Sequence, residues 1–333
     1  MEKNNLPFDS LCLQGMSTKA LMALGGIQFL QDSDRLSGVD KFLGTSSGAV
    51  VSFFLIIGYT PAELLSYICV HKVLEQLTHF NMVAMVNGGG AKSWSKIQET
   101  LEKMTIQKIG YLPTMKCLVD KFKKQLTVVT YNVSKNKVEY ICAKTHPAMP
   151  VLIALHMTAN LPFVFEKFQY QKSYYIDGGV ANNFPLKLAE KTGKRVIGIR
   201  VNNPPVDDSD KETFMAYMYR ILMVPISEVE RVQISDRRKN TCVQTLTTSK
   251  MVRAFDFKFS NTDKMDMFSD GYQQMKQLFS DDGGKSASFS AAKCAALAAA
   301  AASAAAATAV LAIEAAVEKK KKSLKKKKVS HRQ

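Results

Sequence analysis

Several signatures of specialised protein classes are missing from this sequence. Its six cysteines form no CxxC pair and have no regular spacing, so neither a disulfide framework nor a zinc site is indicated. The first 15 residues contain no apolar stretch of the length that a secretory signal needs. No Walker A loop and no dinucleotide fingerprint is present, so nothing points to nucleotide binding. We therefore expect an intracellular, cytoplasmic protein that uses no metal and no cofactor.

Acidic residues are scarce at the C-terminal end of the chain. The 333 residues include 45 lysines and arginines and 29 aspartates and glutamates, which gives a formal charge of +16. Residues 319–333 contain eight lysines, one arginine and no acid, so they supply +9 and leave +7 for the rest. The basic character is therefore largely a property of this tail.

A change in composition predicts where the folded domain ends. After the polar, glycine-containing stretch SDDGGKSASFS, residues 291–317 are dominated by alanine and are followed by the lysine clusters, which is a low-complexity pattern. The chain as a whole has 46% hydrophobic residues, enough for a sizeable core. We predict a domain over residues 1–282 and a tail over residues 283–333.

The tail is compatible with several roles. Residues 294–313 are uncharged over 20 positions, the length of a membrane anchor, but their alanine content favours a soluble helix. The lysine clusters of residues 319–333 could bind an anionic membrane surface, or nucleic acid, or remain a solvated disordered segment. We expect association with a membrane surface, whereas a tail anchor and nucleic-acid binding stay open, and no obligate protein partner is indicated.

Apolar periodicity alternates between short strands and helices over most of the chain. Such alternation predicts an α/β fold with a parallel or mixed sheet that helices cover on both faces. Residues 61–123 have a mainly helical pattern. The predicted strands are residues 10–13, 39–43, 172–177, 194–201 and 253–259, with a hairpin over 126–143, and the predicted helices are residues 19–31, 47–57, 148–159, 211–224, 227–240 and 264–280.

Two adjacent serines lie between two glycines in the segment GTSSG. Only Ser46 has a glycine two positions before it, Gly44, and two positions after it, Gly48, which is the GxSxG pattern of a nucleophile elbow. A strand is predicted before this turn and a helix after it, so the helix N-terminus would face negative charge that develops at the serine. The pattern predicts Ser46 as a nucleophile. The alternative is an ordinary turn in which glycine and serine are simply favoured.

No histidine is well placed to activate this serine. Of the five histidines, only His331 follows late enough for the chain order Ser, acid, His, and it lies in the lysine-rich tail. A carboxylate within hydrogen-bonding reach can accept the proton instead. Asp177 is the best candidate because it ends an apolar strand-like run and precedes Gly178 and Gly179, whereas Asp282 begins a second DGG in a polar linker. Asp177 could otherwise be a turn or helix-capping acid.

The GTSSGA segment and the later DGGVANNFP segment together resemble the motifs of the patatin-like phospholipases, and the resemblance covers roughly residues 9–280. It implies a three-layer α/β/α sandwich around a largely parallel central sheet. It also implies calcium-independent hydrolysis of acyl esters in phospholipids or related lipids. By this resemblance Ser46 matches the family's nucleophile and Asp177 its base, and the reaction passes through an acyl-serine intermediate.

The family also has an oxyanion loop of the form GGGx(K/R)G. The matching segment GMSTKA keeps Gly15 and the basic position Lys19, but Met16 and Ser17 replace two glycines and Ala20 replaces the last. A residue with a Cβ costs about 1–2 kcal/mol in a left-handed conformation, and loss of one oxyanion donor costs about 2.7–4 kcal/mol. We predict oxyanion donors at Gly15, Met16 and Ser17, with Lys19 either in contact with an anion or simply solvated. A catalytically weak or inactive membrane-binding protein is the alternative function.

Overall fold

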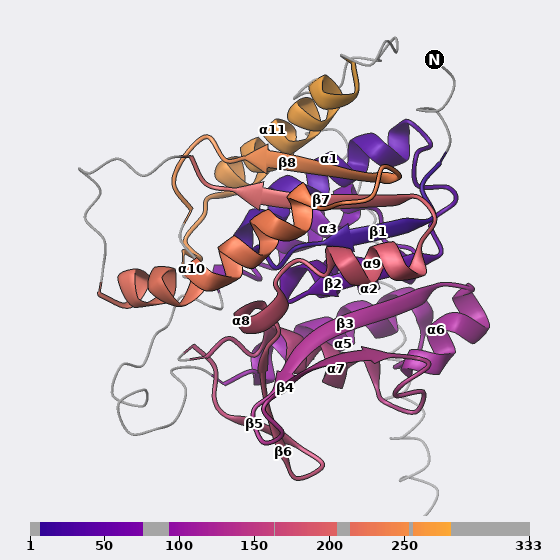
Figure 1. Cartoon of the computed structure of the whole chain (residues 1–333), viewed down its shortest axis with the longest axis vertical. Coiled ribbons are helices and arrows are strands. Elements are labelled where there is room, and N and C mark those ends of the chain that lie inside the picture. Colours follow the sequence, from indigo (N-terminus) through magenta and orange to yellow (C-terminus); the bar gives the residue numbers. More distant parts are fainter. Residues whose placement is uncertain (1–6, 76–92, 163, 205–213, 253–255, 281–333) are drawn as a thin grey trace, which may run out of the picture. The chain divides into compact units, whose positions relative to one another are not determined.

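The computed structural model describes residues 7–75, 93–162, 164–204, 214–252 and 256–280 (Figure 1). These residues belong to a compact unit, Met1–Ala287. The predicted domain end at residue 282 and the whole of the predicted tail lie outside the described residues and stay predictions.

An eight-stranded sheet forms the centre of the described residues, in the order β5-β6-β3-β2-β1-β7-β8, with β4 paired to β3 off this path (Figure 1). The neighbours that run parallel are β3 (Gln125–Asn132), β2 (Lys41–Thr45), β1 (Ser10–Leu13), β7 (Val196–Asn202) and β8 (Thr241–Thr247). The strands that pair antiparallel are β4 (Lys137–Cys142), β5 (Phe168–Tyr170) and β6 (Ser173–Asp177). The predicted α/β fold is confirmed, and its sheet is mixed.

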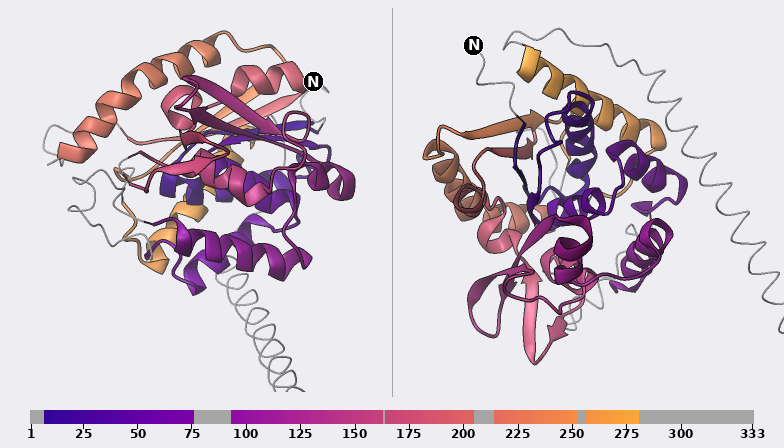
Figure 2. Two further views of the ribbon diagram at one scale, coloured as in Figure 1. Left: turned by 90° about the horizontal axis from the view of Figure 1, so that it is seen from below. Right: turned by 90° about the vertical axis from the view of Figure 1, so that its right-hand side faces the viewer.

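Helices cover both faces of this sheet, as a three-layer α/β/α sandwich requires (Figure 2, left). One face carries α9 (Leu186–Thr192) and α10 (Phe214–Ser235). The other face carries α1 (Ala20–Asp32), α2 (Ser47–Ile56), α7 (Val151–Ala159) and α11 (Asn261–Ser280). Packed against these or lying at the sheet margins are α3 (Pro61–Val70), α5 (Ser95–Ile109), α6 (Met115–Phe122), α8 (Gly179–Asn182) and the 3-10 turn η1 (Ser17–Lys19).

The helices α1 and α2 are buried on nearly all sides. Their sequences, ALMALGGIQFLQD and SGAVVSFFLI, have almost no polar face, which is typical of helices enclosed between a sheet and other helices. A close crossing fixes α1 against α11: a Cβ on Gly25 would lie 1.8 Å from the carbonyl oxygen of Phe268, and one on Gly271 would lie 1.9 Å from that of Met22. Glycine is therefore required at both positions of this crossing.

Two sequence predictions in the C-terminal part of the domain are wrong. The helices predicted at residues 211–224 and 227–240 are one helix, α10, with Pro225 inside it. Proline removes one intrahelical hydrogen bond, and Pro225 is exposed, so water can solvate the carbonyl that loses its donor. The last parallel strand is β8 and not residues 253–259, of which 256–259 have no regular structure. The β8 sequence, TCVQTLT, has no apolar run that would indicate a strand.

None of the described helices is long and apolar enough to cross a bilayer by itself. Only together do α2 and α3 reach the necessary length and composition, and they are bent by 116° at the break between them. The span considered at residues 294–313 lies outside the described residues.

Candidate active site

A shared neighbour, strand β3, brings the two predicted catalytic residues together. One edge of β3 is occupied by β4 along most of its length. The other edge is shared: β2 runs along it until Thr45 lies opposite Val129, and β6 runs the opposite way until Asp177 lies opposite Thr130. Because Val129 and Thr130 are consecutive, the carboxyl ends of β2 and β6 meet. Ser46, the residue after Thr45, therefore lies beside Asp177.

Ser46 occupies the turn between β2 and α2 in a strained backbone conformation. Its φ is 52° and its ψ is −127°, a combination that is rare for a residue with a Cβ. The Ser46 N–H donates to Thr158 Oγ1 at 2.8 Å, and the Thr158 hydroxyl donates to the carbonyl oxygen of Val129. Gly48 lets α2 start close to the neighbouring loop, since a Cβ there would lie 2.5 Å from the carbonyl oxygen of Gln14. The structure thus has the strand, turn and helix that the GxSxG pattern predicted.

Asp177 is buried, with 3% of its surface exposed. Its Oδ1 accepts a hydrogen bond from the Gly179 N–H at 2.7 Å, and its carboxyl lies within hydrogen-bonding reach of the Ser46 side chain. Burial raises the pKa of the Asp177 carboxyl from 3.8 to about 6, although its contacts with Ser46 and the Gly179 N–H oppose this rise. At neutral pH the group is largely ionised, and it is a stronger base than an ordinary aspartate.

Ser46 and Asp177 line a single cavity of about 750 Å³. Part of its wall is apolar, from α3, α5 and the segments next to α5 and α7; this part includes Ile68, Trp94, Ile97, Leu101, Val164 and Phe165. Another part is polar and includes Lys19, Arg200, Asn202 and Glu230. The division suits a ligand that has an apolar chain and a polar head.

The loop of residues 14–19 passes directly beside the Ser46 side chain. A Cβ on Gly15 would lie 3.3 Å from the Cβ of Ser46. The Gly15 N–H donates to the carbonyl oxygen of Asn183 at 2.9 Å, and the Met16 N–H donates to Ser47 Oγ at 3.0 Å. In this conformation both N–H groups form hydrogen bonds inside the protein, and their role as oxyanion donors stays a prediction.

The other two loop residues named by the sequence also lie at the cavity. Ser17 has a φ of 51°, so it adopts a left-handed conformation that is costly for a residue with a Cβ, whereas Met16 has a φ of −128°. Lys19 is half-buried, and burial lowers the pKa of its ammonium; the charge of Glu230 opposes this shift and that of Arg200 adds to it. An anion contact at Lys19 stays a prediction.

Sequence reasoning missed two residues that support the site. Thr158, at the end of α7, links the Ser46 N–H to β3. Glu230, in α10, is 5% exposed and accepts hydrogen bonds from Gln14 Nε2 at 2.7 Å and from Asn183 Nδ2 at 2.9 Å. Thr158 and His156 are the polar residues of an otherwise apolar helix, which is a weak signal. Glu230 is one of several acids in its stretch of sequence, and no local pattern separates it from the others.

Comparison with protein families agrees with this geometry. The model of the family described as "Patatin-like phospholipase" matches residues 11–190, more than half of the chain. The chain belongs to the patatin-like phospholipase family. The matched stretch runs from β1 into α9 and contains both Ser46 and Asp177, so the resemblance drawn from the two motifs is confirmed.

The chain is similar to individual proteins that include viral ones. It is 33% identical over 190 residues to the probable lipid hydrolase 463L of Invertebrate iridescent virus 6, over 55% of this chain and 64% of that protein, which is less than two thirds of the relative's length. It is 21% identical over 250 residues to the uncharacterized protein R571 of Acanthamoeba polyphaga mimivirus, over 72% of this chain and 83% of that protein.

Two solved bacterial structures are similar to this chain at lower identity. VipD from Legionella pneumophila has a TM-score of 0.48 and 14% identity, over 82% of this chain and 67% of that chain. ExoU, in the ExoU-SpcU complex of Pseudomonas aeruginosa, has a TM-score of 0.48 and 13% identity, over 83% of this chain and 52% of that chain.

Proposed function

We propose that the protein is a lipid acyl hydrolase of the phospholipase A type, in which Ser46 is the nucleophile and Asp177 the general base. The observation that carries the proposal is the pairing of the two groups: a serine on a strained turn lies within hydrogen-bonding reach of a buried carboxyl whose pKa is raised to about 6. Membership of the patatin-like phospholipase family supports a lipid ester as the substrate.

In the proposed reaction Asp177 accepts the proton of the Ser46 hydroxyl as Oγ attacks the ester carbonyl carbon. The alcohol or lysophospholipid leaves with that proton, and an acyl-serine remains. Asp177 then accepts a proton from water, the hydroxide attacks the acyl group, and the fatty acid is released with Ser46 restored. The acyl chain would lie along the apolar wall of the cavity, which includes Trp94, Leu101 and Phe165.

The start of α2 is the proposed site for the oxyanion. The N–H of Ser47, the first residue of α2, and the positive end of the helix dipole adjoin the nucleophile. The Met16 N–H can join them if the Ser47 hydroxyl, which now accepts its hydrogen bond, rotates away. The Gly15 N–H is excluded as long as it donates to Asn183.

A catalytically weak, membrane-binding protein is the second candidate function. It is favoured by the loop beside Ser46, where the N–H groups of Gly15 and Met16 are engaged inside the protein and Ser17 has a left-handed φ. Membrane attachment or nucleic-acid binding through residues 319–333 involves residues that the structure does not describe, and both stay predictions.

Labelling and lipid hydrolysis test the proposal directly. We expect a fluorophosphonate to label the wild-type protein on Ser46, and fatty acid to be released from phosphatidylcholine micelles. Ser46→Ala should lose both, and Asp177→Asn should lower kcat by about 10²–10⁴-fold. Ser37→Ala, which changes an exposed serine that does not line the cavity, is the matched control. Equal residual hydrolysis in wild type and both site variants would overturn the proposal, and labelling without turnover would favour the second candidate.

The pH dependence is a second check on the base. Asp177 must be ionised to accept a proton, and its pKa is about 6. We therefore expect kcat/KM on a soluble ester to be level above that pH and to fall about tenfold per unit below it. A base with an ordinary aspartate pKa would keep the activity level down to about pH 4. A level profile through pH 5 would exclude a base whose pKa is about 6.

A further inference from the structure

The helix α10 buries a carboxylate and exposes several apolar side chains. Among its side chains that the structure describes, Ile226 and Glu230 are buried, whereas apolar residues such as Ile221, Val224 and Val232 are about half exposed. A carboxylate is costly to bury unless polar partners surround it. The burial of Glu230 therefore points to a specific role for its contacts.

Glu230 joins segments that are distant in sequence and converge on Ser46. Its Oε2 accepts from Gln14 Nε2 at 2.7 Å, and its Oε1 accepts from Asn183 Nδ2 at 2.9 Å. Gln14 Oε1 accepts from the Val201 N–H of β7 at 3.2 Å. Asn183 Nδ2 also donates to the carbonyl oxygen of Gly15 at 3.1 Å, and the Asn183 carbonyl accepts from the Gly15 N–H at 2.9 Å. Hydrogen bonds from Gln14 and Asn183 to Glu230 thus hold the loop beside the nucleophile.

The donors and acceptors of this network can be arranged in one way only. Turning over the Gln14 amide would put its NH₂ group against the Val201 N–H, donor to donor. Turning over the Asn183 amide would put its oxygen against the carbonyl oxygen of Gly15. Position 230 must therefore offer an acceptor to both amides, which a carboxylate can do and a side-chain amide cannot.

Charged groups around Glu230 are compatible with this acceptor role. Burial raises the pKa of the Glu230 carboxyl, and the hydrogen bond from Asn183, the charge of Arg200, the hydrogen bond from Gln14 and the charge of Lys19 oppose that rise. The two amides and the two cations all favour the ionised form, which has acceptors on both oxygens.

We propose that Glu230 is a positioning residue for the hydrolysis, whose carboxylate holds the loop of residues 14–17 against Ser46 and so keeps the Met16 N–H next to Ser47, at the proposed oxyanion site. It does so in place of the glycines that this loop lacks. The inference rests on the proposed function, because it assigns Glu230 a part in the same reaction. Glu230 itself touches neither the nucleophile nor the base.

The test is an exchange of acid and amide within the network. In Glu230→Gln the introduced amide can accept on one side only, so it must face Gln14 or Asn183 donor to donor. In the double variant Gln14→Glu/Glu230→Gln every hydrogen bond is restored: the carboxylate at position 14 accepts from Val201 N–H and from the amide at position 230, whose oxygen accepts from Asn183. We expect the single variant to lower kcat about 10–100-fold with KM within about threefold, and the double variant to recover most of that loss.

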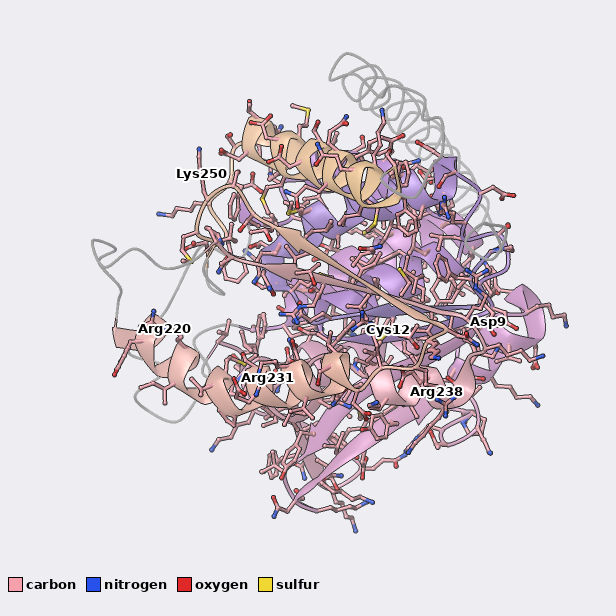
Figure 3. The ribbon with its side chains drawn as sticks, turned by 45° about the horizontal axis from the view of Figure 1, so that its top comes forward. Asp9, Cys12, Arg220, Arg231, Arg238 and Lys250 are labelled. Carbon is pink, nitrogen blue, oxygen red and sulfur yellow. The ribbon has the colours of Figure 1, made fainter. Side chains whose placement is uncertain are left out.

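A surface variant on the same helix is the matched control. Glu228 is exposed and pairs with Arg231, which lies along α10 in Figure 3. Glu228→Gln should keep the wild-type kcat. A purely structural role for Glu230 would lower the melting temperature but leave kcat per folded molecule unchanged, and that result would overturn the proposal. Failure of the double variant to improve on the single variant would also overturn it.

Hydrogen exchange provides a readout that does not depend on turnover. Peptides covering residues 14–19 should exchange faster in Glu230→Gln than in wild type, and the double variant should restore their protection. Wild-type exchange in the single variant would show that Glu230 does not order the loop, and the proposal would fall. Absence of labelling and turnover in the wild type would instead refute the proposed function, while the exchange data still decide whether Glu230 holds the loop.

Discussion

The turn at Ser46 and the loop at residues 14–17 reach the same cavity, but they are built differently. The turn is built from small residues: Gly48 lies where a Cβ would be 2.5 Å from the carbonyl oxygen of Gln14. The loop has one glycine and is held by a hydrogen bond that Asn183 donates and by hydrogen bonds that Ser47 accepts from Met16 and Glu230 accepts from Gln14. Close packing of the backbone requires small residues at fixed positions, so it can be recognised as a sequence motif. Support from side chains that are distant in sequence produces no such motif. Substitutions in each region test that contrast.

The largest expected effect is steric, at the turn. Gly48→Ala should lower the free energy of unfolding by at least about 3 kcal/mol, because the Cβ would collide with the backbone of both Leu13 and Gln14. Gly110→Ala is the control: Gly110 has a φ of 82° and no atom within 4 Å of an added Cβ, so only the left-handed cost of about 1–2 kcal/mol applies. Urea denaturation measures the loss of unfolding free energy in each variant. Equal losses in the two variants would show that close packing at Gly48 adds nothing to the cost of the substitution.

The next effect is electrostatic and has the opposite sign. Because burial raises the pKa of Asp177 from 3.8 to about 6, the folded state binds the proton more tightly than the unfolded state. This contribution to stability is fully present below about pH 4 and is lost as the pH rises through about 6. Asp177→Asn should therefore be less active but more stable than wild type by about 3 kcal/mol at pH 8, with the difference shrinking towards pH 4. Denaturation curves at both pH values measure it, and a difference that does not change with pH would contradict the buried carboxyl.

A somewhat smaller loss is expected where a hydroxyl supports the turn from outside. Thr158→Val removes the acceptor of the Ser46 N–H and the donor to the Val129 carbonyl, which should cost about 1–3 kcal/mol of stability. The control is Thr105→Val: this hydroxyl is also buried, but it donates only to the Leu101 carbonyl within α5. Similar losses of stability in the two variants would mean that the hydrogen bond from the Ser46 N–H contributes no more than an ordinary hydrogen bond within a helix.

The smallest expected effect is in the loop. Ser47→Ala removes the acceptor of the Met16 N–H and should lower stability by about 1 kcal/mol. Ser52, on the same helix, is buried and its hydroxyl has no hydrogen-bond partner among the described residues, so Ser52→Ala should cost nothing. Thermal denaturation of the pair measures the difference. A loss in Ser52→Ala as large as that in Ser47→Ala would show that the loop does not depend on this bond.

The parts of the molecule that could be predicted from sequence follow short-range rules. The GTSSG segment dictates a strand, a tight turn and a helix within a few residues, and the structure has all three. Apolar periodicity likewise placed α1, α7 and α11 to within a few residues. A run of apolar residues also identified β6, the strand that ends at Asp177.

Other parts depend on contacts between distant segments, and they could not be predicted. The strand β8 is held by pairing with β7, and its sequence TCVQTLT has β-branched residues but no apolar run that would indicate a core strand. The helix α10 continues through Pro225, which lies on an exposed side of the helix. The Gly15 N–H donates to the carbonyl oxygen of Asn183, 168 residues away, and no sequence pattern in the loop predicts this partner.

The meeting of β2 and β6 on one edge of β3 has a consequence for how the site is assembled. Both strands pair with the same edge of β3, and each must end in the correct register: β2 at Val129 and β6 at Thr130. A slip of one residue in either pairing would shift that strand by about 3.3 Å and turn its side chains to the opposite face. A folding chain in which β2 has docked but β6 has not would therefore display a finished serine turn with no base beside it.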